Sequence, residues 1–485
     1  MNLKKSHITL ILVAAIVLGF VGAYTGVKVA QPDEQNEGST NDLSDLLGQE
    51  SLNTPQNMEK VAQAYQVIKQ NYIEDVDDTQ LIEGAIKGML GTLEDPYSTY
   101  MDVETMEDFN ETIESSFQGI GAEVSMVNGN VTIVSPIKDS PAEEAGLRPN
   151  DQILSVDGES VKGLELNEAV EKIRGEKGSE VTIEILRSGV SDPFEVTLVR
   201  DDIPLETVYS STETVDGKKT GILELTSFSE TTYDEFTEQL NDLEEEGIEG
   251  LVIDVRGNPG GLLTAVEDIL KLFIPSDMPI VQIEDPNGNR DQTFSDLEEM
   301  KEYPITVLID EGSASASEIL AVAMKEAGYD VVGKTSFGKG TVQQAIPLGD
   351  GSSIKITFFK WLSPNGEWIN EVGVEPTMES NQPDYFYTSP VEIEEPLGLD
   401  DADQKIENLQ IMLTGLGYDT GREDGYFDSQ TEEAVMAFQQ DNDLNVTGEI
   451  DQETAGTIEA NVVENIRNGV DDLQMEDALR SLYEE

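Results

Sequence analysis

Apolar strand-like runs alternate with helical patterns between residues 220 and 376, and this alternation constrains the fold more than any other feature. The runs Leu251–Val255 and Ile305–Ile309 are almost continuously apolar, which is typical of strands buried on both faces of a parallel sheet. Each is followed by a Gly- or Ser-rich turn and a helical pattern, over 262–273 and 318–326. This repeat predicts an α/β core in which strand ends converge on turns.

Three turns of this core carry residues suited to catalysis. They are RGNPGG (256–261), GSASASE (312–318) and SFGKGT (336–341). In open α/β folds the ligand lies where strand ends meet helix N-termini, and free N–H groups there can bind the anion of a tetrahedral intermediate. A serine at such a turn is a candidate nucleophile, and Lys339 is a candidate general base once a dry site removes its proton. The alternatives are a helix N-cap for the serines and a surface position for the lysine.

The residue types that are missing exclude several chemistries. The chain has 485 residues and no cysteine, and its single histidine, His7, precedes an apolar run. Thiol catalysis, disulfides, Cys-type zinc sites, Ser-His-Asp triads and His-ligated catalytic metals are therefore excluded. For a hydrolase a Ser–Lys pair remains, and we expect neither a cofactor nor a metal. Residues 328–335 (GYDVVGKT) match the P-loop pattern, but they resemble a strand with no helix after it, so we do not predict nucleotide binding.

The charge is strongly acidic and limits the partners. There are 98 Asp and Glu against 29 Lys and Arg, a formal net charge of -69. Such a field repels phosphate backbones, so nucleic acid is not a predicted partner. The composition fits a protein exposed to high salt or to an alkaline outside pH.

The N-terminal end predicts a membrane anchor. Lys4 and Lys5 precede an apolar stretch, Ile8–Val27, which at about 1.5 Å per residue can span the hydrocarbon core of a bilayer. The acidic segment from Asp33 onward places the folded body outside the cytoplasm. We therefore expect a single-pass protein of the cell membrane with an extracytoplasmic body; a cleaved signal peptide is the alternative, and it also implies export.

Five stretches together resemble the carboxyl-terminal processing peptidases, the tail-specific proteases of family S41. They are SFQGIGAEV from Ser116, SPAEEAGLRPND from Ser140, DVRGNPGGLL from Asp254, GSASASEIL from Gly312 and SFGKGTVQQ from Ser336. The resemblance covers roughly residues 58–376. It implies an α/β core of the ClpP/crotonase type and a serine endopeptidase that cleaves exported proteins near their C-termini.

The resemblance also implies roles for individual residues. The nucleophile is Ser315, the base is Lys339, and Gln343 assists the lysine; a strand of period two would place the last two on one face. The oxyanion hole consists of the N–H of Ala316 and one N–H from the pair Gly260 and Gly261. Two rival functions remain open, an inactive binding adaptor and a crotonase-like acyl transferase.

The segment 117–200 resembles a PDZ domain. Gly119, Ile120, Gly121 and Ala122 match the loop whose N–H groups hold the terminal carboxylate of a peptide that adds as a strand. Protein substrates read through their C-termini are therefore expected partners. Arg174, after a predicted helix, can pair with the peptide carboxylate, pair with the peptidase core, or lie on the surface without a role.

Residues 404–461 resemble the small three-helix peptidoglycan-binding domain. The resemblance rests on segments such as LGY (416–418), DGYFD (424–428) and FQ (438–439), and on Gly448. The apolar residues have helical spacing and are most simply core, so peptidoglycan as a partner rests on the resemblance. A homodimer is also left open.

Together these observations predict a multidomain α+β protein. In chain order, its segments are a transmembrane anchor (1–30), a linker (31–56), an N-terminal helical region (57–115), a β-sandwich-like PDZ domain (116–203), the peptidase core (204–385), a linker (386–403), a three-helix peptidoglycan-binding-like domain (404–462) and an acidic tail (463–485), for which a helix is the alternative.

The charge predicts that the folded body requires salt. Two like charges 4 Å apart repel by about 1 kcal/mol even in bulk water, and many such pairs rival a domain stability of about 5–15 kcal/mol. Salt shortens the screening length from about 30 Å at 0.01 M to about 3 Å at 1 M. The melting temperature of a fragment from Met58 onward should therefore rise steeply with NaCl over this range. A flat melting temperature would show that the carboxylates need no screening.

Overall fold

The structure is a computed structural model that describes residues 58–484, apart from 128, 138–139, 188–189 and 191–192. The predicted anchor (1–30) and first linker (31–56) lie outside the described residues. Within the described part, none of the helices combines the length and the apolar character that a membrane crossing requires. The chain forms two compact units, and the boundary between them lies after Gly84.

The predicted helical region (57–115) is mostly helical. It contains α3 (Met58–Asn71), α4 (Asp78–Gly91) and α5 (Val103–Glu114). Asp78 joins the first two helices, because it accepts hydrogen bonds from Tyr65 (2.8 Å) and pairs with Lys69 (2.6 Å). The helical pattern did not predict the short strand β1 (Thr99–Met101), which pairs antiparallel with β18 (Ser353–Leu362).

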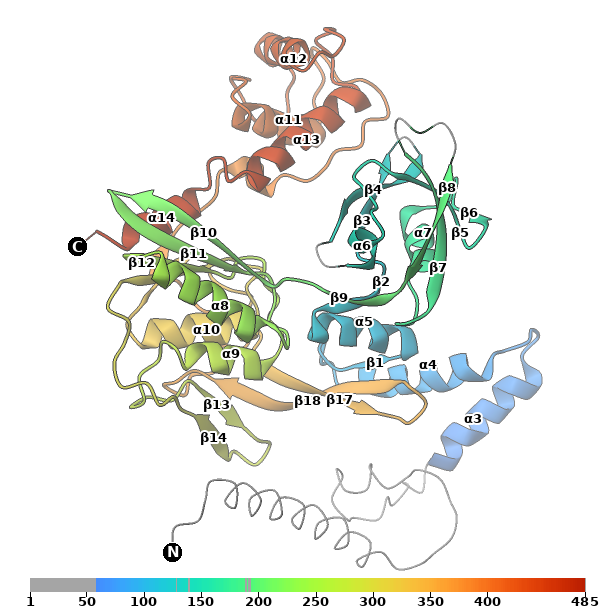
Figure 1. Ribbon diagram of the computed structural model, residues 1–485, viewed down its shortest axis with the longest axis vertical. Helices are drawn as coiled ribbons and strands as arrows, with labels where there is room; N and C mark the ends of the chain where they lie inside the picture. The colour runs from blue at the N-terminus through green and yellow to red at the C-terminus, as the bar shows by residue number, and fades with distance from the viewer. Residues whose placement is uncertain (1–57, 128, 138–139, 188–189, 191–192, 485) are drawn as a thin grey trace, which may run out of the picture. The chain divides into compact units, whose positions relative to one another are not determined.

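A six-stranded sheet forms the centre of the α/β core (Figure 1), in the order β10-β11-β12-β15-β16-β19. All pairings are parallel except that of β10 with β11. Every residue of β12 and β15 is buried, as their apolar runs predict. The six strands are Val208–Val215, Lys218–Leu225, Gly250–Asp254, Ile305–Ile309, Asp330–Gly333 and Met378–Glu379.

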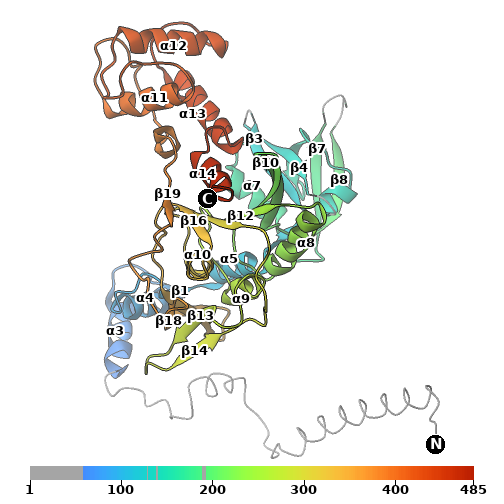
Figure 2. The same ribbon diagram turned by 90° about the vertical axis from the view of Figure 1, so that its left-hand side faces the viewer.

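Helices cover both faces of this sheet, and the second face is covered by a distant segment. One face packs against α8 (Thr232–Glu245), α9 (Leu263–Leu270) and α10 (Ala316–Glu326). On the other face, Val252 and Leu308 pack against Ala478 of α14 (Leu473–Ser481). Figure 2 shows α14 next to the strands of this sheet. Because successive residues of a strand point to opposite faces, both faces need such a cover.

A second sheet of five strands lies beside the first. The turn SFGKGT (336–341) ends where strand β17 of this sheet begins. Its path is β1-β18-β13-β14, and β17 pairs with β18. The added strands are β13 (Val281–Glu284), β14 (Arg290–Thr293) and β17 (Thr341–Pro347). The register of β17 against β18 shifts between Val342 and Gln343, which marks a bulge.

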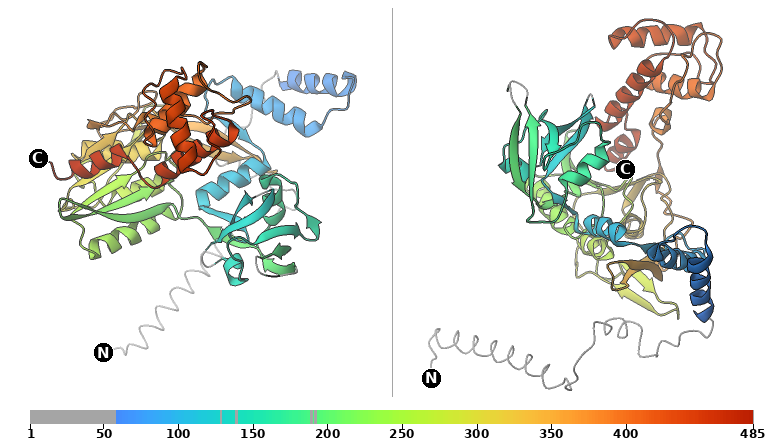
Figure 3. Two further views of the ribbon diagram at one scale, coloured as in Figure 1. Left: turned by 90° about the horizontal axis from the view of Figure 1, so that it is seen from above. Right: turned by 90° about the vertical axis from the view of Figure 1, so that its right-hand side faces the viewer.

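The predicted PDZ domain forms a sheet β3-β4-β5-β7-β8, with β6 paired to β5, and a separate pair β2-β9. Its strands lie in the blue-green to green part of the chain (Figure 3), and Ala169 and Ile173 of the helix α7 belong to their core. The helix spans Leu166–Ile173 and β5 spans Gln152–Val156. The other elements are β2 (Ser116–Gly119), β3 (Ala122–Val127), β4 (Asn130–Pro136), α6 (Pro141–Glu144), β6 (Glu159–Ser160), β7 (Glu180–Leu186), β8 (Phe194–Val199) and β9 (Asp201–Pro204).

The C-terminal module contains the three predicted helices α11 (Gln404–Gly415), α12 (Ser429–Asp441) and α13 (Gln452–Arg467). Two buried glutamines serve equivalent purposes in it. Gln410 donates to Tyr426 O (2.9 Å) and accepts from Gly425 N (3.0 Å), and Gln439 makes the corresponding bonds to the loop before α13. Satisfied amides of this kind fix the two loops that connect the helices.

In two predicted segments the structure differs from a free linker and a solvated tail. The linker predicted at 386–403 is not a free connector, because Val391 and Ile393 are buried in the core of the C-terminal module, beside Tyr385 of a 3-10 turn (Asp384–Tyr387). The tail predicted at 463–485 is helical, which was the alternative. Its apolar residues recur at helical spacing and pack on the sheet, so its many acids do not keep it in solvent.

Candidate active site

The serine-rich turn presents one of its three serines to a cavity. Ser313 and Ser317 are fully buried; the Oγ of Ser313 donates to Val255 O (2.8 Å) and that of Ser317 to Asn258 O (2.9 Å). Ser315 is only partly buried and lines the cavity. It is the N-cap of α10 and forms a capping box with Glu318, but among the described residues its Oγ donates no hydrogen bond. The flanking serines therefore hold the turn together, whereas Ser315 is available for chemistry.

The backbone of Ser315 is strained. It lies between β15 and α10 with φ 56° and ψ -110°, a left-handed conformation that a residue with a side chain rarely adopts. Such conformations cost about 1–3 kcal/mol and persist where the surroundings impose them, often at functional sites. A sharp strand-to-helix turn of this kind exposes a side chain at the start of a helix.

The glycine turn after β12 packs directly against the serine turn. Gly260 has φ +98°, and an added Cβ would lie 2.7 Å from Ala314 O and 2.8 Å from Ser315 Cβ, so only glycine fits. The N–H of Gly260 donates to Asn258 Oδ1 (2.8 Å). The described residues provide no acceptor for the N–H of Gly261 or of Ala316, and both residues line the cavity. Of the predicted glycine pair, Gly261 is thus the one with a free donor.

Lys339 lines the same cavity and its amine is partly dry. Burial, followed by the positive charge of Lys355, lowers the pKa of Lys339, while the carboxylates of Glu318 and Asp95 oppose this shift. The ring of Tyr97 lies 5.1 Å from its Nζ. A lowered pKa increases the fraction of neutral amine at a given pH, which is the form that can accept a proton.

A buried glutamate, which the sequence analysis did not single out, joins the two turns. Glu318 is fully buried, and its Oε2 accepts the backbone N–H groups of Ser315 and Lys339, both at 2.8 Å. Its Oε1 accepts from Gly338 N and Ser336 Oγ, both at 2.6 Å. The signal in the sequence was an acid at the third position of a helix after a serine, which typically indicates only a capping box.

Gln343 lines the same cavity, but it does not reach it through the regular strand spacing from Lys339 that was predicted. Lys339 precedes β17, and the bulge before Gln343 breaks the period-two relation. The Nε2 of Gln343 donates to Thr341 Oγ1 (2.9 Å) and Thr357 Oγ1 (3.1 Å), and Thr357 donates to Asp95 Oδ2 (2.7 Å). The turn at Asp95 therefore belongs to the site.

The rest of the cavity wall is largely apolar. It includes Leu262 and Leu263 after the glycine turn, Ile319 of α10, and Phe109 and Ile113 of α5. An extended peptide segment bound here would place apolar side chains against these residues. Lys355 of β18 is the cationic exception beside Lys339.

A second groove lies in the PDZ-like domain at the predicted loop. It is lined by Phe117, Gly119, Ile120, Gly121, Ala122, Val124, Val170, Ile173 and Arg174. Gly121 has φ +73°, and an added Cβ would lie 2.3 Å from Ser140 Cβ. Arg174 lies over the ring of Phe117 (4.9 Å) and pairs with Glu111 of α5 (3.0 Å). Arg174 therefore connects the groove with the helix that lines the larger cavity.

The formal P-loop match is not a phosphate loop in this fold. Val331 and Val332 are buried in β16, and the chain continues from Gly333 into the lysine loop without a helix. Val331 and Val332 thus lie in a strand, as the sequence indicates.

The fold and the cavity together indicate the class of protein. A strained serine at a strand-to-helix turn, free N–H groups beside it and a lysine with lowered pKa are the arrangement of a serine hydrolase. Comparison with known families agrees. Residues 219–380 match the model for peptidase family S41, 132–187 match a PDZ domain, 16–105 match "Activating protease CtpB N-terminal domain" and 402–458 match "Putative peptidoglycan binding domain".

Relatives match over nearly the whole chain. The chain is 49% identical to the carboxy-terminal processing protease CtpB of Bacillus subtilis (strain 168), over 99% of this chain and 100% of that protein. It is 41% identical to the CtpA protease of the same strain, over 91% and 94%. The chain belongs to the carboxy-terminal processing proteases of peptidase family S41 and is a serine peptidase. A solved photosystem II D1 C-terminal processing protease shares 26% identity with a TM-score of 0.41, over 67% of this chain and 93% of the other.

The charge of Lys355 gives a testable pH effect. Lys355→Gln removes a positive charge that disfavours the ammonium form of Lys339, so the pKa of Lys339 should rise. The pH at half-maximal peptide cleavage should then move upward. Lys360→Gln, on the same strand but paired with Glu284, is the matched control and should leave the profile in place. An unchanged or downward midpoint in Lys355→Gln would contradict the assignment.

Proposed function

We propose that this chain is an endopeptidase that uses Ser315 as nucleophile and Lys339 as general base to cleave exported proteins near their C-termini. The observation that carries the proposal is the separation of roles in the serine turn. Ser313 and Ser317 use their hydroxyls to hold the turn, whereas the strained Ser315 lines the cavity together with Lys339.

In the proposed reaction, the neutral Lys339 amine takes the proton of Ser315 Oγ while this oxygen attacks the scissile carbonyl carbon. The N–H groups of Gly261 and Ala316 hold the oxyanion of the tetrahedral intermediate. The protonated lysine then donates its proton to the leaving amine. Water, activated by the same lysine, attacks the acyl-enzyme and releases the shortened chain.

Gln343 orients the lysine in this proposal. The two threonines that accept from its Nε2 leave its Oε1 as the atom available to accept a hydrogen bond from the Lys339 ammonium. Glu318 holds the backbones of both catalytic residues through their N–H groups. Neither residue needs to transfer a proton itself.

The PDZ groove selects substrates by their terminal carboxylate. Support comes from the groove at Gly119–Ala122, where backbone N–H groups of a glycine-containing loop can bind an anion and a peptide can add beside β3. The matches to a PDZ domain and to a peptidoglycan-binding domain support binding of peptides and of cell wall. We further propose that the apolar segment Ile8–Val27 tethers the enzyme to the membrane with its catalytic body outside the cytoplasm.

Ser315→Ala should remove essentially all turnover of an unstructured peptide, by about 10³-fold or more, because the attacking oxygen is lost. Its thermal unfolding should remain close to that of the unchanged enzyme. Ser313→Ala and Ser317→Ala should instead lose about 1–2 kcal/mol of stability, since each removes a buried hydrogen bond, but should still cleave. A dead Ser313→Ala enzyme beside an active Ser315→Ala enzyme would refute the assignment.

Amidating the C-terminus of a peptide substrate should lower kcat/KM, because the loop N–H groups lose their anion. The effect should be about tenfold, the value of one charge-assisted hydrogen bond of about 1.5 kcal/mol. Gly121→Ala distorts the loop through its contact with Ser140, so this variant should cleave the free and amidated peptides alike. Equal cleavage of both peptides by the unchanged enzyme would rule out carboxylate reading.

A further inference from the structure

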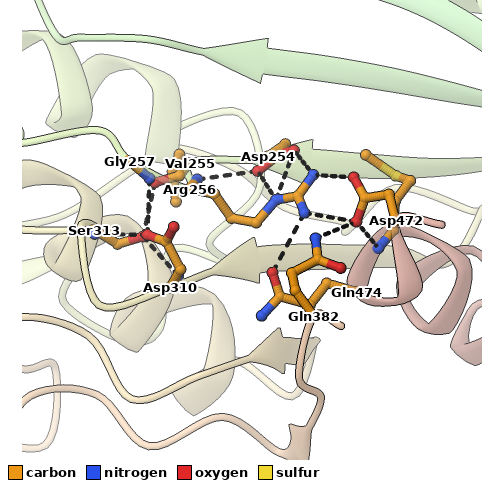
Figure 4. A network of polar contacts seen from close by, with 10 residues as sticks. Asp254, Val255, Arg256, Gly257, Asp310, Ser313, Gln382, Asp472 and Gln474 are labelled. Carbon is orange, nitrogen blue, oxygen red and sulfur yellow. Dashed lines mark hydrogen bonds and ion pairs between the residues drawn. The ribbon is translucent and has the colours of Figure 1, made fainter. Parts of the chain in front are cut away.

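A half-buried ion pair lies at the base of the glycine turn (Figure 4). Arg256 lies two residues after the end of β12 and precedes Gly257, and its guanidinium pairs with two carboxylates. It binds Asp472 through two parallel bonds, Nη1 to Oδ1 at 2.8 Å and Nη2 to Oδ2 at 2.9 Å, and Asp254 at 2.7 Å. The side chains of Arg256 and Asp472 are only 17% and 19% exposed. A bidentate pair of this geometry fixes both partners.

Asp472 comes from the segment that leaves the C-terminal module. It caps α14 by accepting from Met475 N (3.0 Å). It also accepts from the Nε2 of Gln382 (2.6 Å), which lies in the segment that enters the module. A second bond, from Gln474 Nε2 to Ser380 O (3.0 Å), joins the same two segments. Arg256 also donates to Gln474 Oε1 (3.3 Å), so the leaving segment binds Arg256 directly and the entering segment is joined to it through Asp472 and Gln474.

The residue after Arg256 is connected by hydrogen bonds to the serine turn. Gly257 N donates to Asp310 Oδ1 (2.8 Å), and the same oxygen accepts from Gly312 N (2.9 Å) and Ser313 N (3.1 Å). Asp310 thus joins the beginnings of the glycine turn and the serine turn. Holding Arg256 fixes where the glycine turn starts, and Gly261 lies at the end of that turn.

We propose that Asp472 is a positioning residue for the peptidase reaction: through Arg256 it sets the position of the N–H of Gly261 relative to Ser315. The C-terminal module is then inserted between two segments that are both fastened to the catalytic turn. This proposal rests on the proposed function, in which Gly261 is an oxyanion donor. Asp472 itself does not touch the substrate.

The test uses the full chain with Asp472→Asn, which keeps the shape and removes the charge. Displacing one oxyanion donor should lower kcat about 10- to 100-fold, because removal of such a donor costs about 10²- to 10³-fold. KM should change by less than about twofold, and the pH midpoint should not move, because Lys339 is untouched. The affinity for a peptide aldehyde, whose adduct with serine carries an oxyanion, should fall in parallel with kcat. Asp472→Glu should recover part of the loss.

Asp477→Asn is the matched control. Asp477 also lies on α14 and accepts from Ser380 Oγ (2.7 Å), but it does not contact Arg256. Gln382→Leu is a milder second variant, because it removes one bond to Asp472 and leaves the ion pair; we expect a smaller fall in kcat in the same direction. Thermal unfolding curves show the temperature range in which each variant is folded.

Equal kcat in Asp472→Asn and Asp477→Asn, or an unchanged kcat in Gln382→Leu, would overturn the proposal. The proposal would also be overturned if Asp472→Asn lowered the affinity for the peptide aldehyde by no more than it changed KM. Failure of the proposed function itself is recognised separately, since Ser315→Ala would then still cleave.

Discussion

The buried carboxylate of Glu318 is the interaction on which the active site depends. A carboxylate removed from water is costly unless donors surround it, and here three backbone N–H groups and the hydroxyl of Ser336 do so. Two of these N–H groups belong to Ser315 and Lys339, which are brought by different strands of the sheet. The bond from the Ser315 N–H to this carboxylate helps to hold the strained backbone of Ser315 in place.

Around this centre the site is assembled from segments far apart in the chain. The N-terminal turn at Asp95 orients Gln343 through Thr357, and α5 forms one wall of the cavity. The pair of Arg174 with Glu111 connects that wall to the PDZ groove. Because α5 contacts both sites, a peptide that competes for Arg174 would also change the contacts of the cavity wall.

Continuous apolar runs predicted the α/β core and helical spacing predicted a small helical C-terminal module, because both are local signals. The PDZ domain and the three-helix type of the module were predicted from their resemblance to known families. Through the resemblance, the sequence also predicted Ser315, Lys339 and Gln343 as neighbours, and the structure places all three on one cavity. It did not predict the roles of Glu318 and Asp95, because one looks like a helix cap and the other like a turn. Whether Gly260 or Gly261 offers a free N–H depends on the side chain of Asn258, which no pattern of spacing reveals.

The position of α14 has a consequence for the order of folding. The strands of the core sheet are made before the C-terminal module, yet Val252 and Leu308 are covered only when α14, which follows that module, has docked. A chain whose synthesis has not reached α14 therefore leaves this apolar sheet face uncovered and lacks Asp472, the partner of Arg256. With the positioning role proposed for Asp472, full proteolytic competence would arise only after the C-terminal module has been made.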